Sequence, residues 1–266
     1  MHCNSSDSCT WKLREHDVGY TSTHRFAWRL ARARSSDDGR ARMALRLLYF
    51  PLRGRGDCIR EILHAAGVPF SEETPEYAAL KAGAGSQTYP FGQLPVLVDG
   101  EFHVAQQDAI VRHLARKLSL YGKDEVEMTV VDMVLLGVED IRRKYLDLVY
   151  GREMEETAKK EYVAKHVDPS SMHERVSGAH FAYLEAMLDR HAGKSGYAVG
   201  EGFTVADVLL FDIVDAHLRP AMCPETMRAH YPKLIKHYEF VSQMKGIKEY
   251  LEGPTRPSKV NGNGLG

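Results

Sequence analysis

The chain has 266 residues, 44% of them hydrophobic, and its 35 basic and 36 acidic residues leave a formal net charge of -1. That length can bury one large core or two smaller ones, and the evenly mixed charges provide no basic stripe for neutralising nucleic-acid phosphates. Its apolar runs all fall short of the roughly 20 residues that span a bilayer, and no secretory signal pattern follows the first methionine. We therefore expect a soluble, cytoplasmic protein that binds neither nucleic acid nor a membrane.

The cysteines indicate a reducing compartment and give no sign of a metal. Cys3, Cys9, Cys58 and Cys223 form no CxxC pair and no cluster with histidines at zinc spacing. A zinc site, a dithiol redox centre and a disulfide framework each require a recognisable spacing. We therefore predict no metal site.

Residues 1–42 differ in composition from the rest of the chain, because they are rich in serine and arginine and have little apolar periodicity. We expect this extension to be disordered. Arginine and serine are typical of an organelle-targeting peptide and acidic residues are not, yet this segment contains both. Three interpretations stay open: a targeting segment, a disordered extension, and an artefact of start-site choice that is absent from the mature protein.

Residues 43–120 have the pattern of a small α/β domain. The apolar run at 45–50 predicts a buried strand, and one face of a following helix, ending at Gly67, is marked by Ile59, Ile62, Leu63 and Ala66. Residues 68–72 can form a second strand, because the segment between them has the length of a parallel βαβ crossover.

A loop, a hairpin and a second helix complete this domain. Residues 75–92 predict a loop of about twenty residues, which is longer than loops without a role usually are. Asp99-Gly100, between the apolar runs 94–98 and 102–104, is a strong hairpin signal, and residues 108–118 have helical spacing. The expected order is βαβ followed by ββα, with four strands and helices on the faces.

Beyond a linker at 121–124, residues 125–253 have helical spacing and predict an all-helical domain. Its clearest local signal is a capping box, in which Thr204 is the residue before the helix and Asp207 is its partner three residues later. We interpret this box as a structural helix start without a catalytic role. Residues 254–266 form a tail rich in proline and glycine.

The candidate site lies at the end of the first predicted strand. There a helix N-terminus favours an anionic ligand. Tyr49 lies near this edge, where its hydroxyl could donate to a thiolate and stabilise it; it could instead be a core tyrosine with its hydroxyl at the rim. Arg55, in the turn before the helix, would add a positive charge to the site, or be a solvated loop residue.

Two further stretches favour a peptide ligand with carboxylates. Leu94-Pro95 stands where a loop enters a strand, which suggests a cis peptide bond and a backbone open to an extended peptide. Gln106-Gln107-Asp108 precedes the second helix, whose N-terminus can hold a carboxylate, although Asp108 could simply cap that helix. With Tyr49, these residues describe a site for a small thiol peptide.

Several short stretches form a more specific pattern: YFPLRGR at 49–55, GQLP at 92–95, AIVRHL at 109–114, LYGKD at 120–124, GVED at 137–140, KY at 144–145 and NGNG at 261–264. They resemble the cytosolic glutathione transferases, the pi class above all, and the similarity extends from Leu45 to the C-terminus. The resemblance implies a thioredoxin-like domain, an all-helical domain, a homodimer and glutathione as co-substrate.

The resemblance also implies roles for individual residues. Tyr49 would hold the glutathione thiolate, and Arg55 would support it electrostatically. The residues that would bind glutathione are Gln93, Leu94, Pro95, Gln106, Gln107 and, from the other subunit, Asp140. The electrophile pocket would be lined by Phe50, Leu52 and Tyr150, and Phe91 would insert into the partner subunit.

Three positions depart from the pi-class pattern. Where that class has a tryptophan, a lysine and a serine, this chain has Leu80, Ser86 and Gln107. Loss of the lysine removes a charge-assisted hydrogen bond of about 1.5 to 3 kcal/mol, which would weaken glutathione binding roughly ten- to hundredfold. Conjugation of glutathione to hydrophobic electrophiles, in detoxification, is the favoured function. Glutathione-dependent isomerisation and a non-catalytic ligand-binding or structural role stay open.

Overall fold

The computed structural model describes residues 45–174 and 178–266, and the expectations for residues 1–42 lie outside this part of the chain. The strands are β1 (Leu45–Leu48), β2 (Phe70–Glu73), β3 (Val96–Asp99) and β4 (Phe102–Ala105). The α-helices are α1 (Asp57–Ala65), α2 (Tyr77–Ala82), α3 (Gln107–Lys117), α4 (Glu125–Leu146), α5 (Glu156–His166), α6 (Phe181–His191), α7 (Val205–His217), α8 (Pro224–His230), α9 (Pro232–Ser242) and α10 (Lys245–Glu252). Shorter turns of helix are η1 (Gly54–Gly56), η2 (Asp147–Gly151), which has π-helical hydrogen bonding, and η3 (Pro169–Glu174).

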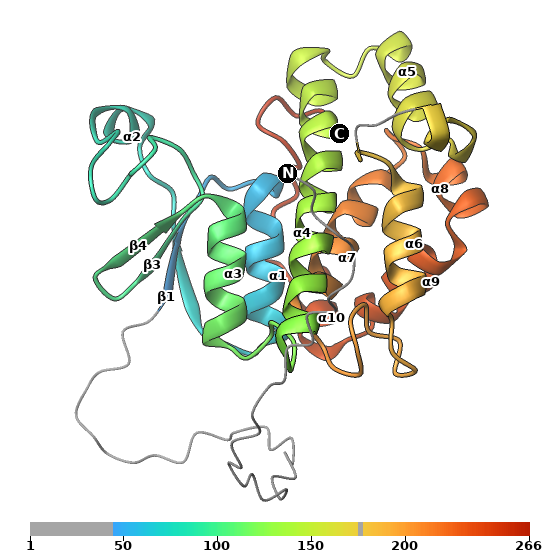
Figure 1. Ribbon diagram of the computed structural model, residues 1–266. Coiled ribbons are helices and arrows are strands. Elements are labelled where there is room, and N and C mark those ends of the chain that lie inside the picture. The colour runs from blue at the N-terminus through green and yellow to red at the C-terminus, as the bar shows by residue number, and fades with distance from the viewer. Residues whose placement is uncertain (1–44, 175–177) are drawn as a thin grey trace, which may run out of the picture. The chain divides into compact units, whose positions relative to one another are not determined.

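The four strands form one mixed sheet in the order β2-β1-β3-β4 (Figure 1). β1 and β2 are parallel, and β3 is antiparallel to both β1 and β4. The predicted βαβ crossover and the predicted hairpin are therefore both confirmed. The hairpin turns at Gly100, whose φ of 66° is in the left-handed region that favours glycine.

Helices α1 and α3 lie between the sheet and the helical region (Figure 1). Leu45 and Leu47 of β1 belong to the large core that the sheet shares with these helices. Leu48, with Val96 and Val98, belongs to a second, smaller cluster. The alternation follows from the pleat of a strand, which points successive side chains to opposite faces. Both faces of β1 therefore contribute to a core, although Arg46, on the same face as Leu48, is exposed.

Two element boundaries differ from the sequence prediction. β1 ends at Leu48 rather than residue 50, although the Tyr49 amide still donates to the Glu73 carbonyl at 3.0 Å. The segment 75–92 is not entirely a loop, because it contains the six-residue helix α2. Leu80 is the one buried residue of α2, so this helix lacks the repeated apolar positions by which a helix is recognised in a sequence.

Helix α4 packs along α7 in the helical region. The Asp124 carboxylate caps α4 by accepting the Glu127 amide at 2.9 Å. The predicted capping box before α7 is confirmed, and Asp207 accepts the Thr204 amide at 2.8 Å. Asp207 is fully buried, and its other oxygen accepts the Ala198 amide at 2.7 Å and lies 3.0 Å from Nε2 of His237. This carboxylate thus fixes three segments of the helical region.

The C-terminal tail is ordered and returns to the first domain. The amides of Arg53 and Gly54 donate to the carbonyls of Lys259 and Val260, both at 2.9 Å. Nε of Arg53 donates to the Pro257 carbonyl at 2.8 Å. The tail therefore holds the turn between β1 and α1.

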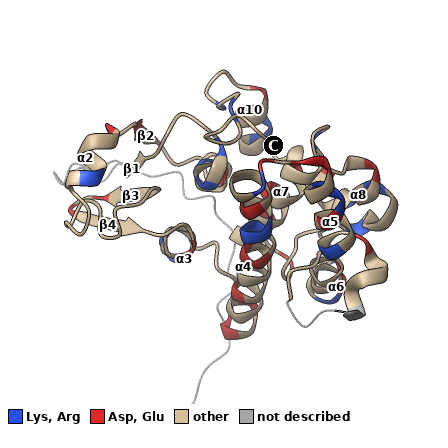
Figure 2. Ribbon diagram, turned by 90° about the horizontal axis from the view of Figure 1, so that it is seen from above, with Lys and Arg blue, Asp and Glu red and all other residues tan. Residues whose placement is uncertain are grey.

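None of the described helices is both long and apolar enough to cross a membrane. Along α4 the acidic residues come before the basic residues 142–144, whereas α5 has acidic and basic residues interspersed (Figure 2).

We expect Asp207→Ala to lower the free energy of unfolding by roughly 3 kcal/mol or more, because it removes a helix cap and leaves buried N–H groups without an acceptor. Urea unfolding at fixed protein concentration measures this loss. Glu201→Ala is the control, since Glu201 is exposed and accepts the amides of Lys194 and Ser195 at 3.1 and 3.2 Å. Equal losses in the two variants would contradict the prediction.

Candidate active site

Tyr49 is buried at the end of β1, with 7% of its surface exposed. Its hydroxyl accepts the Arg55 backbone N–H at 2.8 Å. The turn that supplies this N–H contains two glycines for steric reasons: a Cβ at Gly54 would lie 2.6 Å from the Tyr49 hydroxyl, and one at Gly56 would overlap its ring. The Gly54-Arg55-Gly56 sequence therefore allows the turn to close over the tyrosine.

The environment keeps the Tyr49 hydroxyl protonated. Burial raises the pKa of Tyr49 to about 12, and the hydrogen bond from the Arg55 amide opposes this rise only in part. The hydroxyl oxygen is already an acceptor for Arg55, so its own hydrogen remains for donation to another group. A neutral O–H donor of this kind stabilises an anion placed beside it.

The Arg55 side chain makes a bidentate ion pair with Glu139 of α4. Its Nη1 and Nη2 each lie 2.9 Å from a different Glu139 oxygen, and Nη1 also donates to Oε1 of Gln107 at 3.4 Å. Arg55 therefore acts on Tyr49 through its backbone, while its positive charge is compensated by Glu139. Sequence reasoning missed Glu139; its only signal was its place in the GVED stretch, next to Asp140.

Gln93 and Gln106 meet at the other end of the site. Nε2 of Gln106 donates to Oε1 of Gln93 at 3.1 Å. Gln106 has a φ of 70°, which a residue with a side chain adopts only at a cost of about 1 to 3 kcal/mol.

The Leu94-Pro95 peptide bond is cis, as predicted. Helix α3 begins at Gln107 rather than at 108, so Asp108 lies within its first turn and is not its cap.

Two residues that depart from the pi-class pattern, Leu80 and Ser86, lie in the segment 75–92, and both make contacts within the protein. Leu80 is buried in α2 and has no polar group to offer. The Ser86 hydroxyl accepts the Tyr89 amide at 3.2 Å. Lys81, the nearby cation, lies with its ammonium 5.4 Å from the centroid of the Tyr77 ring.

The three predicted electrophile-pocket residues lie around Tyr49. The Phe50 ring centroid is 6.1 Å from that of Tyr49, and Leu52 is buried. Tyr150 lies on η2 and is 50% exposed, and its electrostatic influence raises the pKa of Tyr49. The Tyr150 hydroxyl accepts the Gly262 amide at 2.8 Å, so the C-terminal tail also borders the site.

Asp140 and Phe91 do not join this cluster. Asp140 is exposed on α4, in line with the exposed apolar side chains of Met133 and Leu136. Phe91 has 64% of its surface exposed.

The comparisons with known proteins follow the same division of the chain. Residues 45–116 match the family profile described as "Glutathione S-transferase, N-terminal domain", and residues 139–254 match "Glutathione S-transferase, C-terminal domain". Glutathione S-transferase P of Bos taurus and that of Homo sapiens are each 32% identical over 219 residues, which is 82% of this chain and 97% of either relative. The chain belongs to the glutathione S-transferase family.

Solved structures of family members agree with this assignment. The Onchocerca volvulus Pi-class glutathione S-transferase superposes with a TM-score of 0.70 at 30% identity, covering 84% of this chain and all of the other. The glutathione S-transferase from Ascaris lumbricoides gives a TM-score of 0.62 at 32% identity, covering 78% and 96%. The predicted fold, a thioredoxin-like domain followed by a helical domain, is confirmed.

We expect Tyr49 to ionise near pH 12 instead of near its ordinary pKa of about 10, because burial disfavours the charged form. The measurement is the ultraviolet difference spectrum of tyrosinate between the unaltered chain and Tyr49→Phe, with circular dichroism to show that both remain folded. Tyr77→Phe removes a tyrosine that is 62% exposed and calibrates the signal of one residue. If the difference in absorbance corresponds to one tyrosine and its midpoint lies near pH 10, burial does not raise the pKa of Tyr49 and the prediction is wrong.

Proposed function

We propose that this chain catalyses conjugation of the glutathione thiolate to hydrophobic electrophiles. The observation that carries the proposal is the hydroxyl of Tyr49, which is buried, stays protonated at neutral pH, and has its oxygen oriented by the Arg55 amide. Such a donor has one chemical use in a site for a thiol peptide. It stabilises the sulfur once the sulfur is ionised.

In the proposed reaction, the glutathione thiol loses its proton to solvent and the thiolate sulfur accepts the Tyr49 O–H. The sulfur then attacks the electrophilic carbon with its electron pair, forming a C–S bond while the leaving group departs or a carbon–carbon π bond takes up a proton. A thiol has a reference pKa of about 8.5, and a hydrogen bond to the charged form lowers it. More thiolate is then present at neutral pH.

The remaining predicted residues fit the ends of the same ligand. The γ-glutamyl carboxylate would lie at the N-terminus of α3, next to Gln106 and Gln107, where free backbone N–H groups favour an anion. The cysteinyl backbone would pair with Leu94 beside the cis-Pro95, and Gln93 would reach the glycyl end. Hydrophobic electrophiles would lie over Phe50, Leu52 and Tyr150.

A second candidate is a ligand-binding or structural protein with weak glutathione affinity. The observation that favours it is the loop 75–92, where Leu80 is apolar and buried and the Ser86 hydroxyl is already hydrogen-bonded to Tyr89. Neither side chain offers a charge to the glycyl carboxylate. An isomerase would use the same Tyr49 thiolate and differs only in its substrate.

We also propose a cytoplasmic homodimer. Phe91, Met133 and Leu136 are large apolar side chains that are each about half exposed or more in the single chain, and burial against a partner would remove them from water. Asp140 lies in the same exposed row of α4, which would bring it toward the glutathione amine of the partner subunit.

The Tyr49→Phe variant tests the transferase site. With glutathione raised to millimolar concentration, we expect the unaltered protein to give a saturable thiolate absorbance at neutral pH. The variant loses a hydrogen bond to a charged group, so we expect the bound thiol pKa to rise by roughly 1 to 2 units and the conjugation rate to fall about ten- to hundredfold. Saturable glutathione binding without a thiolate signal in either protein would favour the ligand-binding alternative.

The Glu139→Gln variant tests whether the ion pair between Glu139 and Arg55 holds the turn that supplies the Arg55 amide to Tyr49. It removes the charge from both contacts to Arg55 and leaves only one acceptor oxygen, which should loosen the Arg55 amide and lower kcat/KM about tenfold. Asp132→Asn is a matched control, because Asp132 on the same helix pairs with Arg112 at 2.8 Å. If both variants lose activity equally, the effect comes from α4 as a whole and the role of Glu139 is refuted.

A further inference from the structure

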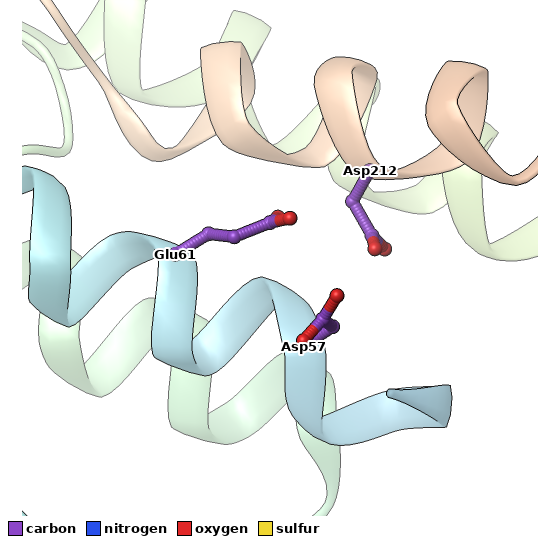
Figure 3. A group of neighbouring side chains, drawn as sticks. All are labelled: Asp57, Glu61 and Asp212. Carbon is purple, nitrogen blue, oxygen red and sulfur yellow. The ribbon is translucent and has the colours of Figure 1, made fainter. Parts of the chain in front are cut away.

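Three carboxylates of α1 and α7 converge in the protein interior (Figure 3). They belong to Asp57, Glu61 and Asp212, and one oxygen of each lies within 4.8 Å of the others. Asp57 accepts the Tyr250 hydroxyl at 2.5 Å, and Asp212 pairs with Arg142 at 2.6 Å. Glu61 is fully buried, and neither of its oxygens has a hydrogen-bond partner in the described structure.

Nearby arginines make this group unsuitable for a cation. Asp212 and Asp57 are engaged by Arg142 and by Arg256, whose Nη2 is 3.5 Å from Asp57 and 3.9 Å from Glu61. A divalent ion would lie against these guanidinium groups. Burial and the adjacent aspartates raise the pKa of Glu61 well above its ordinary value, which favours its neutral form.

The three carboxylates belong to a larger network of arginines and aspartates. Asp215 is shared by three arginines, with Arg256 and Arg219 at 3.0 Å and Arg53 at 3.8 Å. Arg55 and Arg60 have carboxylates of their own in Glu139 and Glu72. Among the described residues of this region, Arg53, Arg142, Arg219 and Arg256 therefore face the carboxyl groups of Asp57, Glu61, Asp212 and Asp215.

A small cavity adjoins this network. Its volume is about 20 Å³, which is sufficient for one water molecule or one compact ion. It is bounded by the turn 53–55, α4, α7 and the C-terminal tail. Four arginines line it, and the lining carboxylate is that of Asp212. The arginines are Arg53, Arg55, Arg142 and Arg219.

Two of these arginines carry buried donors without acceptors. Nε of Arg142, and Nε and Nη1 of Arg219, make no hydrogen bond in the described part of the chain. Arg142 itself is 4% exposed. A buried charged donor that lacks an acceptor costs more free energy than a neutral one, because its lost hydration is greater. These N–H groups therefore require an acceptor that the described side chains do not supply.

We propose that this cavity binds one small monovalent anion of the size of chloride, held by Arg142 and Arg219. The anion accepts hydrogen bonds from the unpaired N–H groups of both arginines. A water molecule satisfies the donors less well, because it brings no charge and hydrogen bonds between two charged groups are the stronger ones. The bound anion would link α4 and α7 behind the turn that positions Tyr49. The proposal does not depend on glutathione binding.

The first test is crystallographic. Crystals of the whole chain are soaked in sodium bromide, and anomalous scattering locates the bromide ions. We expect a peak between the side chains of Arg142 and Arg219. Bromide found only at surface positions, or a water molecule in the cavity at high bromide concentration, would overturn the proposal.

The second test measures stability in solution. At constant ionic strength, replacement of gluconate, which is too large for the cavity, by chloride should raise the Tm saturably by about 2 to 4 °C. Arg219→Leu should abolish this shift. Arg219→Lys keeps the charge beside Asp215 but loses the forked donors, so about tenfold more chloride should be needed for half the shift.

The control is Arg152→Leu, which removes an arginine paired at 2.8 Å with Glu161 outside the cavity. It should keep the full chloride effect. If Arg219→Leu fails to fold, Arg219→Lys still tests the proposal. A chloride effect that is unchanged in Arg219→Lys, or absent from the unaltered protein, would show that the cavity does not bind the anion.

Discussion

The hydrogen bond from the Arg55 amide to the Tyr49 hydroxyl depends on a turn that is held from three directions. Beneath it, the Tyr49 ring fills the space that the glycines at 54 and 56 leave open. From α4, Glu139 holds the Arg55 guanidinium by two bonds of 2.9 Å. From the C-terminus, the tail carbonyls of Lys259 and Val260 accept the amides of Arg53 and Gly54. The short helical turn η1 is thereby held by contacts from three parts of the chain.

This arrangement gives both domains a part in the proposed site. The thioredoxin-like domain supplies Tyr49 and the N-terminus of α3, while the helical domain supplies Glu139 and Tyr150. Arg55 connects them, and the pairing of its charge means that the thiolate would be stabilised mainly by a neutral O–H. Stabilisation of the thiolate by a neutral donor depends less on salt concentration than stabilisation by an exposed charge would.

The interior between α1, α4 and α7 is unusually rich in arginine for a protein core. Buried charges are tolerated only when they are paired and hydrogen-bonded, and here aspartates from two helices provide most of the partners. The tail contributes Arg256 to this network. The electrostatics of the core and the closure of the tail are therefore coupled.

The sequence by itself determined the features that depend on neighbouring residues. The Asp99-Gly100 hairpin, the cis bond at Leu94-Pro95 and the capping box of Thr204 and Asp207 were all predictable, because a few adjacent side chains fix the backbone there. Tertiary structure alone decided that Glu139 pairs with Arg55, that α2 forms within the loop, and that the tail reaches residues 53 and 54. Those contacts join positions 84 or more residues apart, or rest on a single buried leucine, and leave no periodic signal in the chain.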